Sequence, residues 1–135
     1  MYKHILVPIA PDHPDSANAS IAIAKRLLEE GGLITLLTVM EPVPSYVAQY
    51  IPASQQEKNR AAVLADLEKD VAALENAEAK IAIGHPAREI EDYAENHDVD
   101  CIVIASHRPG LQDYFLGSTA ARVVRHAKCA VHVLR

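Results

Sequence analysis

Tryptophan is absent from this 135-residue sequence, and five Tyr and one Phe bring its aromatic content to only 4%. So few rings provide no platform on which nucleic-acid bases stack. The formal net charge of −5, from 13 Lys and Arg against 18 Asp and Glu, is the wrong sign for general binding to nucleic acid or anionic membranes. The apolar runs also fall far below the ~20 residues of a membrane-spanning helix. We therefore expect neither a nucleic-acid partner nor a membrane span.

Cysteine occurs only at Cys101 and Cys129, too rarely for a disulfide framework or a four-cysteine zinc site. None of the seven histidines lies in a His-Glu-x-x-His pattern, so no metal site is expected either. The N-terminal residues lack the layout of a signal peptide. These features favour a cytoplasmic protein with two reduced, mostly buried thiols.

Short apolar stretches alternate along the chain with amphipathic segments, and there is no internal repeat or linker, so residues 1–135 are expected to form one domain. Strands are expected at residues 5–10, 33–39, 79–83, 101–105 and 130–134. This alternation predicts an α/β fold in which helices cover both faces of a parallel sheet. Ligands of such sheets bind at the carboxyl ends of the strands, where the strand order reverses.

Several local signals predict where the helices begin and end. Asp15 or Ser16 is expected to cap the first helix, and Gly31-Gly32 to end it. Residues 40–53 contain Pro42, Pro44 and Pro52 and are expected to be irregular. Residues 54–57, Ser-Gln-Gln-Glu, match a capping box for the next helix. Two further helices are expected at residues 87–96 and from 117–118 to about 126.

The segment with the clearest chemical signal is 105–119, which joins a buried strand to the last helix. Gly117-Ser118-Thr119 opens that helix, where unpaired backbone N–H groups and the positive end of the helix dipole attract an anion. The two hydroxyl groups of this triplet add donors, and His107 and Arg108 can approach the same anion from the other side. We interpret the segment as a phosphate site. The alternative is that Ser118 merely caps the helix.

The sequence contains neither the lysine-bearing phosphate loop of efficient NTPases nor the Gly-x-Ser-x-Gly of a hydrolase elbow. His107, Asp113 and His13 are the visible candidates for a base. We therefore favour nucleotide binding with slow turnover or none, and no residue is assigned as catalytic. One alternative is a slow ATPase or self-phosphorylating enzyme, and another is a protein that has lost nucleotide binding and acts through its surface.

Several motifs resemble one family over essentially the whole chain. They are the opening Ile-Leu-Val-Pro-Ile, the Gly84-His85-Pro86 turn and the closing Gly-Ser…Val-Val-Arg-His-Ala…Val-His-Val-Leu pattern. The sequence resembles the universal stress protein family, and Ser106-His107-Arg108-Pro109 followed by Leu116-Gly117-Ser118 is similar to one small bacterial subgroup. The resemblance implies a Rossmann-type, adenine-nucleotide α-hydrolase-like sheet of order 3-2-1-4-5. It also implies a dimeric stress-response regulator that binds ATP, with Mg²⁺, or another adenine nucleotide.

The family's nucleotide motif is Gly, two residues, Gly, nine residues, then Gly and Ser or Thr. Here Ala105 and Arg108 replace the first two glycines and eight residues precede Gly117. Carried over by position, the resemblance places Pro8, Ile9 and Ala10 at the nucleoside. The family commonly has aspartate at the position of Ala10, and either Asp12 takes over its role or this chain lacks that interaction. The resemblance assigns the backbone of Val39 to the adenine edge. Ile104, Ala105, Ser106 and His107 would wall the ribose and phosphates, Arg108 would reach the same phosphates, and Gly117, Ser118 and Thr119 would hold the phosphate tail.

The last expected strand, residues 130–134, is an edge strand in a sheet of order 3-2-1-4-5. It is apolar and β-branched and contains no proline or lysine, so an uncovered edge there would favour aggregation. We expect this strand to pair with its own copy across a two-fold axis, which agrees with the dimers that the resemblance implies. The alternative is that residues 40–53 or a terminus shield it.

Overall fold

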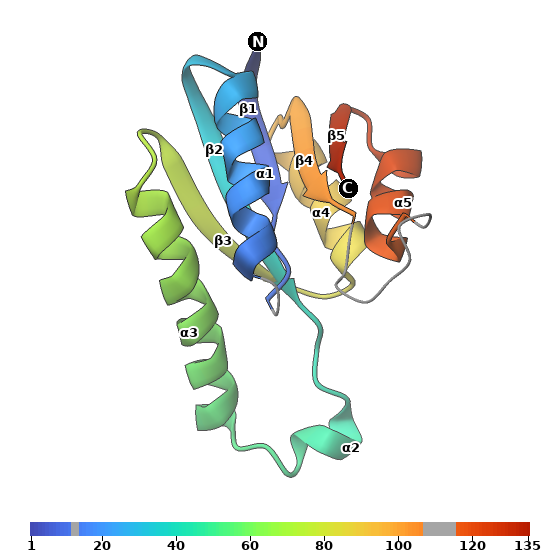
Figure 1. Cartoon of the computed structure of the whole chain (residues 1–135). Helices are drawn as coiled ribbons and strands as arrows, with labels where there is room; N and C mark the ends of the chain where they lie inside the picture. The colour runs from blue at the N-terminus through green and yellow to red at the C-terminus, as the bar shows by residue number, and fades with distance from the viewer. Residues whose placement is uncertain (12–13, 107–115) are drawn as a thin grey trace.

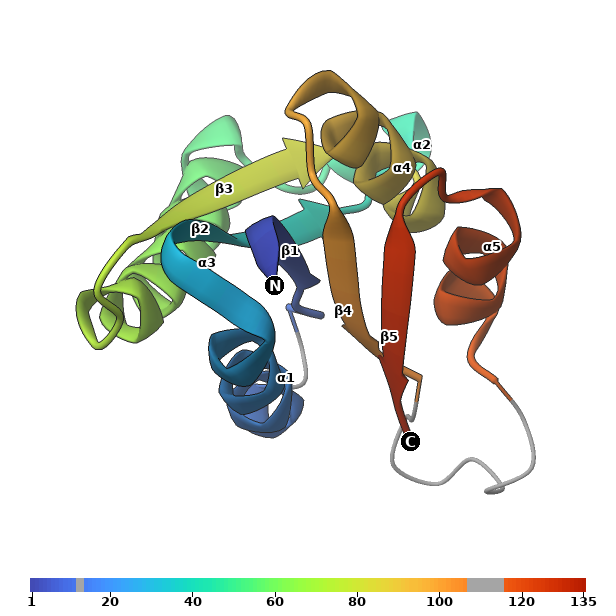
Figure 2. The same ribbon diagram turned by 90° about the horizontal axis from the view of Figure 1, so that it is seen from above.

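Five parallel strands lie side by side in the order β3-β2-β1-β4-β5 (Figures 1 and 2). The computed structural model describes residues 1–11, 14–106 and 116–135. The strands are β1 Tyr2–Pro8, β2 Leu28–Met40, β3 Ala77–Ile83, β4 Cys101–Ala105 and β5 Ala130–Leu134. The helices are α1 Pro14–Leu27, α2 Ser45–Ala48, α3 Ala53–Ala72, α4 Pro86–Asn96 and α5 Ser118–His126. The predicted α/β class, strand order and parallel direction are all confirmed.

Helices cover both faces of the sheet, as Figure 2 shows most clearly. Ile5 and Val7 of β1 pack with α1 and α3, whereas Leu6 between them packs with α4 and α5. All three side chains are fully buried, because successive side chains of a strand point to opposite faces. This double burial is the reason that Ile5–Val7 of β1 and Cys101–Ala105 of β4 are apolar without alternation. Within the described part of the chain, no helix is both long and apolar enough to cross a membrane.

Gly31 and Gly32 do not end the first helix, as the sequence had suggested. The helix α1 already stops at Leu27, and both glycines lie inside β2. Tyr2 is opposite Leu28 and His4 is opposite Leu33, so β2 contains extra residues at this point of the ladder. Gly31 has a φ of +81°, and a Cβ on Gly32 would lie 2.6 Å from Cδ1 of Leu28. The glycines therefore permit an irregular start of a strand, a role for which the sequence offered no separate signal.

The helix starts also differ from three of the predictions. Helix α1 begins at Pro14, so Asp15 and Ser16 lie in its first turn and not before it. Helix α3 begins after Pro52, without a side-chain cap, so the predicted capping box at residues 54–57 is wrong. Residues 40–53 include the short helix α2, which follows Pro44. Proline is tolerated at helix starts because the first N–H groups have no intrahelical acceptor there.

Both cysteines are free thiols, as expected. Cys101 is buried in β4, and burial together with the nearby Cys129 raises its pKa to about 11. Cys129, half-buried just before β5, also has a raised pKa, chiefly because of burial. Thiols held in the protonated form are poor nucleophiles, so both act as small core residues.

A network of polar side chains crosses the sheet from the amino-terminal parts of β1 and β3 through the middle of β2. Thr35 is fully buried and donates to Oε1 of Glu78 at 3.0 Å, while Nε2 of His4 lies 2.8 Å from the Thr35 hydroxyl. The Tyr93 hydroxyl of α4 donates to the same Glu78 oxygen at 3.2 Å. Burial and the Glu78 carboxylate raise the pKa of Tyr93. Each buried polar group in this network therefore has a partner, which removes the cost of burying it.

The central seam of the sheet, between β1 and β4, is short. Only Ile5–Cys101 and Leu6–Ile102 are paired in it. The carboxylate of Asp100 extends the seam at its amino end by accepting the backbone N–H groups of Lys3 and His4, each at 2.9 Å. Burial opposes ionisation of Asp100, but these donors outweigh it and hold its pKa below the usual range.

We predict that Asp100→Asn lowers the free energy of unfolding by about 1 kcal/mol at neutral pH, because an amide has a single acceptor oxygen for two N–H groups. A carboxylate with a depressed pKa stabilises the fold above about pH 4 and loses that effect as the pH falls through the lower folded value. The stability gap between wild type and variant should therefore narrow at acid pH. Urea unfolding at pH 7 and pH 3 checks this, and an unchanged gap at pH 3 would contradict it.

The backbone N–H and carbonyl groups of β5 point alternately toward β4 and toward the open edge of the sheet. Leu134 turns its carbonyl toward β4, where it accepts the N–H of Ser106 at 2.8 Å. Because the backbone groups of alternate residues point to opposite sides of a strand, those of Val131 and Val133 point away from β4. The described part of the chain provides no strand on that side. The pattern supports the expected pairing of β5 with a second copy, which stays a prediction.

We predict that Val133→Pro converts a homodimer into a monomer, because it removes an outward N–H at the proposed seam while leaving the β4–β5 ladder intact. Val133→Thr retains that N–H and serves as the matched control. Light scattering at micromolar concentration checks both variants. A wild-type monomer, or a Val133→Pro variant that remains dimeric, would exclude this interface.

Candidate functional site

The candidate site opens where β1 and β4 part, at the carboxyl ends of the strands. Beyond Leu6 the two strands are no longer paired, and β1 itself ends at Pro8, which has no N–H to donate. The strand order reverses between β1 and β4. Strands β2 and β3 lie on one side of β1, whereas β4 and β5 lie on its other side. A crevice forms at such a reversal, since the connections leave the sheet in opposite directions.

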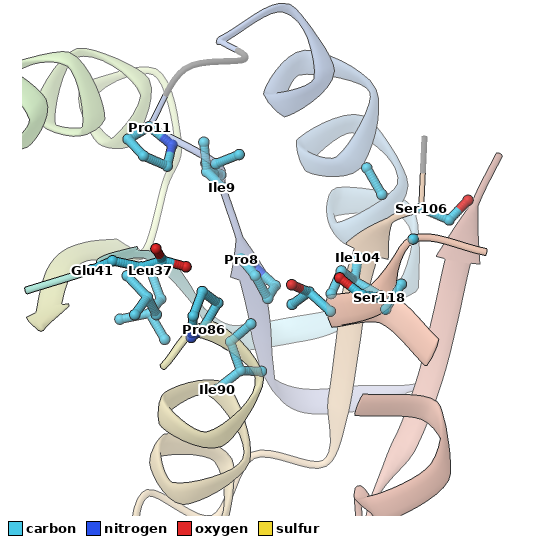
Figure 3. Close-up of a pocket in the computed structure, with 16 residues that line it drawn as sticks. Pro8, Ile9, Pro11, Leu37, Glu41, Pro86, Ile90, Ile104, Ser106 and Ser118 are labelled. Carbon is cyan, nitrogen blue, oxygen red and sulfur yellow. The ribbon is translucent and has the colours of Figure 1, made fainter. Parts of the chain in front are cut away.

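A pocket of about 490 Å³ fills this crevice (Figure 3). That volume lies in the range of sites for small molecules and cofactors. Every described residue that the sequence analysis assigned to the site lines it: Pro8, Ile9, Ala10, Val39, Ile104, Ala105, Ser106, Gly117, Ser118 and Thr119. The predicted residues Asp12, His107 and Arg108 lie outside the described part of the chain. The structure thus brings together segments from three strand ends and one helix start.

The start of α5 forms one end of the pocket. The first hydrogen bond of the helix runs from the N–H of Ala121 to the carbonyl of Gly117 at 2.8 Å. The N–H groups of Ser118, Thr119 and Ala120 therefore have no acceptor within the helix, and no side chain caps it. Ser118 lies inside the helix and does not cap it, so the alternative of a simple Ser118 cap is wrong. These donors and the helix dipole favour an anion at this end.

Gly117 is held against the preceding strand. Its N–H donates to the carbonyl of Ser106 at 3.1 Å, and a Cβ on Gly117 would lie 2.9 Å from that oxygen. Any side chain at this position forces the start of α5 away from the end of β4. The glycine is therefore required by the packing of two backbone segments, and its replacement disturbs the fold as well as the space beside it.

The hydroxyl of Ser106 is already engaged. It donates to the carbonyl of Leu134 at 2.8 Å, and the N–H of Ser106 donates to the same oxygen. Ser106 is buried and joins the end of β4 to β5. Its hydroxyl proton is thus not available to a phosphate, and its contribution to the site is to fix the wall between β4 and α5.

The backbone of Val39 points into the site. Leu37 turns its carbonyl toward β1, where it accepts the N–H of Ile9 at 2.8 Å, and Met40 turns its carbonyl toward β3, where it accepts the N–H of Gly84 at 3.0 Å. By the alternation of a parallel strand, the N–H and carbonyl of Val39 face the β1 side. Because β1 has already ended there, both groups border the pocket.

The sequence analysis missed part of the pocket wall. Leu37, Pro86, Ile90 and Ala120 add apolar surface, and Pro11 and Glu41 stand at the rim. Pro86 and Ile90 come from α4, so the helix that covers this face of the sheet also walls the pocket (Figure 3). Their apolar spacing was visible in the sequence, but only as a signal for core packing. Glu41 lies among residues 40–53, which were expected to be irregular, and no local signal marked it as a site residue.

A crevice at a strand-order reversal is typical of doubly wound α/β proteins. The chain belongs to the universal stress protein family, whose family model matches residues 1–135. The family assignment made from the sequence motifs is confirmed.

A universal stress protein of Methanothermobacter thermautotrophicus is 31% identical over 100% of this chain and 97% of its own length. The structure is similar to that of universal stress protein UspA from Lactobacillus plantarum, with a TM-score of 0.81, 28% identity and coverage of 99% and 98% of the two chains. It also shares its fold with a universal stress protein family protein from Arabidopsis thaliana, whose structure has AMP bound. That pair has a TM-score of 0.65 and 22% identity, with 96% and 90% of the chains covered.

Proposed function

We propose that this protein is a stress-response regulator that binds an adenine nucleotide, ATP with Mg²⁺, in the pocket between β1, β4 and α5. The observation that supports this most directly is the pairing of an uncapped α5 start with an apolar slot in one cavity of about 490 Å³. The α5 end of the cavity suits a phosphate group, and the apolar slot suits the purine ring. The bound AMP in the Arabidopsis thaliana neighbour supports the same ligand class.

In this proposal each described segment of the pocket contacts a particular part of the nucleotide. The N–H groups and hydroxyls of Ser118 and Thr119 bind the phosphates. Ile104 and Ala105 of β4, with Pro8 of β1, border the ribose, and the backbone of Val39 bonds the adenine edge. Asp12, His107 and Arg108 keep the roles that their positions in the sequence suggested.

Mg²⁺ would enter with the phosphates. It prefers octahedral oxygen ligands and is commonly held by phosphates, water and one or two protein oxygens. The hydroxyls of Ser118 and Thr119 are the described protein oxygens at the phosphate end, since the pocket's described carboxylate, Glu41, stands at the other end (Figure 3). Bound there, the ion would neutralise phosphate charge.

We predict that Ser118→Asp weakens ATP binding by about tenfold or more, because its carboxylate repels the phosphates. The same substitution leaves the thermal midpoint unchanged or higher, since a negative charge stabilises the first turn of a helix. Loss of binding is thereby separated from loss of folding. Isothermal titration calorimetry and thermal unfolding give the two readouts.

Ala53→Asp is the matched control, because it adds the same charge at the exposed start of α3, outside the pocket. It should bind ATP as the wild type does. Absence of ATP binding at millimolar concentration by the wild-type protein would overturn the proposed function. Wild-type affinity in Ser118→Asp would overturn the assignment of phosphates to α5.

We further propose that the nucleotide is bound without rapid turnover. The described lining contains no lysine and no histidine, and its single carboxylate stands away from the phosphate end. Ordinary enzymes turn over on the order of 10 times per second. We predict a rate at least a hundredfold slower, measured as phosphate release from Mg·ATP by highly purified protein. Hydrolysis at ordinary rates that is lost in His107→Ala would instead establish an ATPase.

A further inference from the structure

Glu41 is the only ionisable side chain among the described residues that line the pocket. It follows directly on β2, which ends at Met40. Within the described part of the chain it makes no hydrogen bond and no ion pair. A carboxylate that borders an otherwise neutral and mostly apolar pocket without a protein partner is available to a ligand.

The backbone on both sides of Glu41 is restrained, which places the residue at the end of β2. Met40 is paired with Ile83, and its carbonyl accepts the N–H of Gly84 at 3.0 Å, so β2 is anchored up to the preceding residue. Pro42 follows, and a residue before proline is restricted to extended conformations. Figure 3 shows Glu41 on the β2 side of the pocket, on the side opposite Ser118.

The position of Glu41 relative to α5 decides which part of a nucleotide meets it. The pocket runs from α5 and β4 across the end of β1 to β2. Adjacent strands lie about 4.8 Å apart, so β4 and β2 are separated by about 10 Å. With the phosphates at α5, the ribose lies over β4 and β1 and the base lies at β2, between Leu37 and Ile90. Glu41 then stands at the edge of the base.

A carboxylate accepts hydrogen bonds and donates none. The 6-amino group of adenine offers two N–H donors, of which the backbone carbonyl of Val39 takes one. The 6-oxo group of guanine or hypoxanthine at the same place is an acceptor, which a carboxylate repels. The carboxylate also repels the phosphates and so disfavours a reversed orientation of the nucleotide.

We propose that Glu41 recognises the 6-amino group of the bound base, and thereby selects adenine nucleotides over 6-oxopurine nucleotides. This inference rests on the proposed function, because it requires a purine nucleotide with its phosphates at α5. It goes beyond that function by naming the residue that determines base specificity.

Calorimetric titration with two ligands tests the inference. They are ATP and purine riboside triphosphate, which lacks only the 6-amino group. The analogue lacks both hydrogen bonds of the amino group, to Glu41 and to the Val39 carbonyl, so the wild-type protein should bind ATP more than tenfold more tightly than the analogue. Glu41→Ala should lose about tenfold of its ATP affinity and should bind the analogue as the wild type does. The variant should fold normally, because Glu41 has no described partner to lose.

Glu68→Ala removes an exposed carboxylate from α3, outside the pocket, and should change neither affinity. If Glu41→Ala weakens ATP and the analogue equally, the carboxylate does not recognise the amino group and the inference is wrong. If the loss disappears with 2′,3′-dideoxy-ATP, Glu41 contacts the ribose instead, which also overturns it. If the wild-type protein does not bind ATP at all, the proposed function fails first, so the two failures are distinguishable.

Discussion

The arrangement of the whole molecule depends on the short seam between β1 and β4. Strand β1 is bonded to β2 along most of its length but to β4 through only two residue pairs. At its amino end the seam is closed by Asp100, whose carboxylate accepts two backbone N–H groups of β1. At its carboxyl end Pro8 stops the ladder and the strands diverge. The amino end of the seam is thus closed by hydrogen bonds, and the pocket opens at the carboxyl end.

The polar groups at the two ends of the sheet differ in whether they have hydrogen-bond partners within the protein. Toward the amino ends of β1 and β3, the side chains of His4, Thr35, Glu78 and Tyr93 bond to one another. At the carboxyl end the first N–H groups of α5 have no intrahelical acceptor and Glu41 has no described partner. Unpaired donors and acceptors at the edge of a cavity cost free energy unless water or a ligand binds them. These groups border the pocket in which we propose that the nucleotide binds.

Charge is distributed along the pocket in a way that matches a nucleotide. The positive end of the α5 dipole and the Glu41 carboxylate stand on opposite sides of a largely apolar slot (Figure 3). An elongated ligand with a negative end and a donor-bearing ring is favoured in one orientation and disfavoured in the other. In the proposed orientation, the described lining places no carboxylate, lysine or histidine side chain beside the phosphates.

The sequence by itself determined the α/β class, the five strands and the start of α5 at Ser118. These features depend on local signals, namely buried apolar runs, helical periodicity and the Gly117-Ser118-Thr119 triplet. Tertiary structure alone decided the roles of Gly31 and Gly32 within β2, the hydrogen bond from the Ser106 hydroxyl to Leu134 and the position of Glu41 across the pocket from α5. Each of these depends on a neighbour far away in the sequence, such as Lys3 beside Gly32 or α5 across the pocket from Glu41. No local pattern encodes such an interaction, because it exists only when the strands have found their order in the sheet.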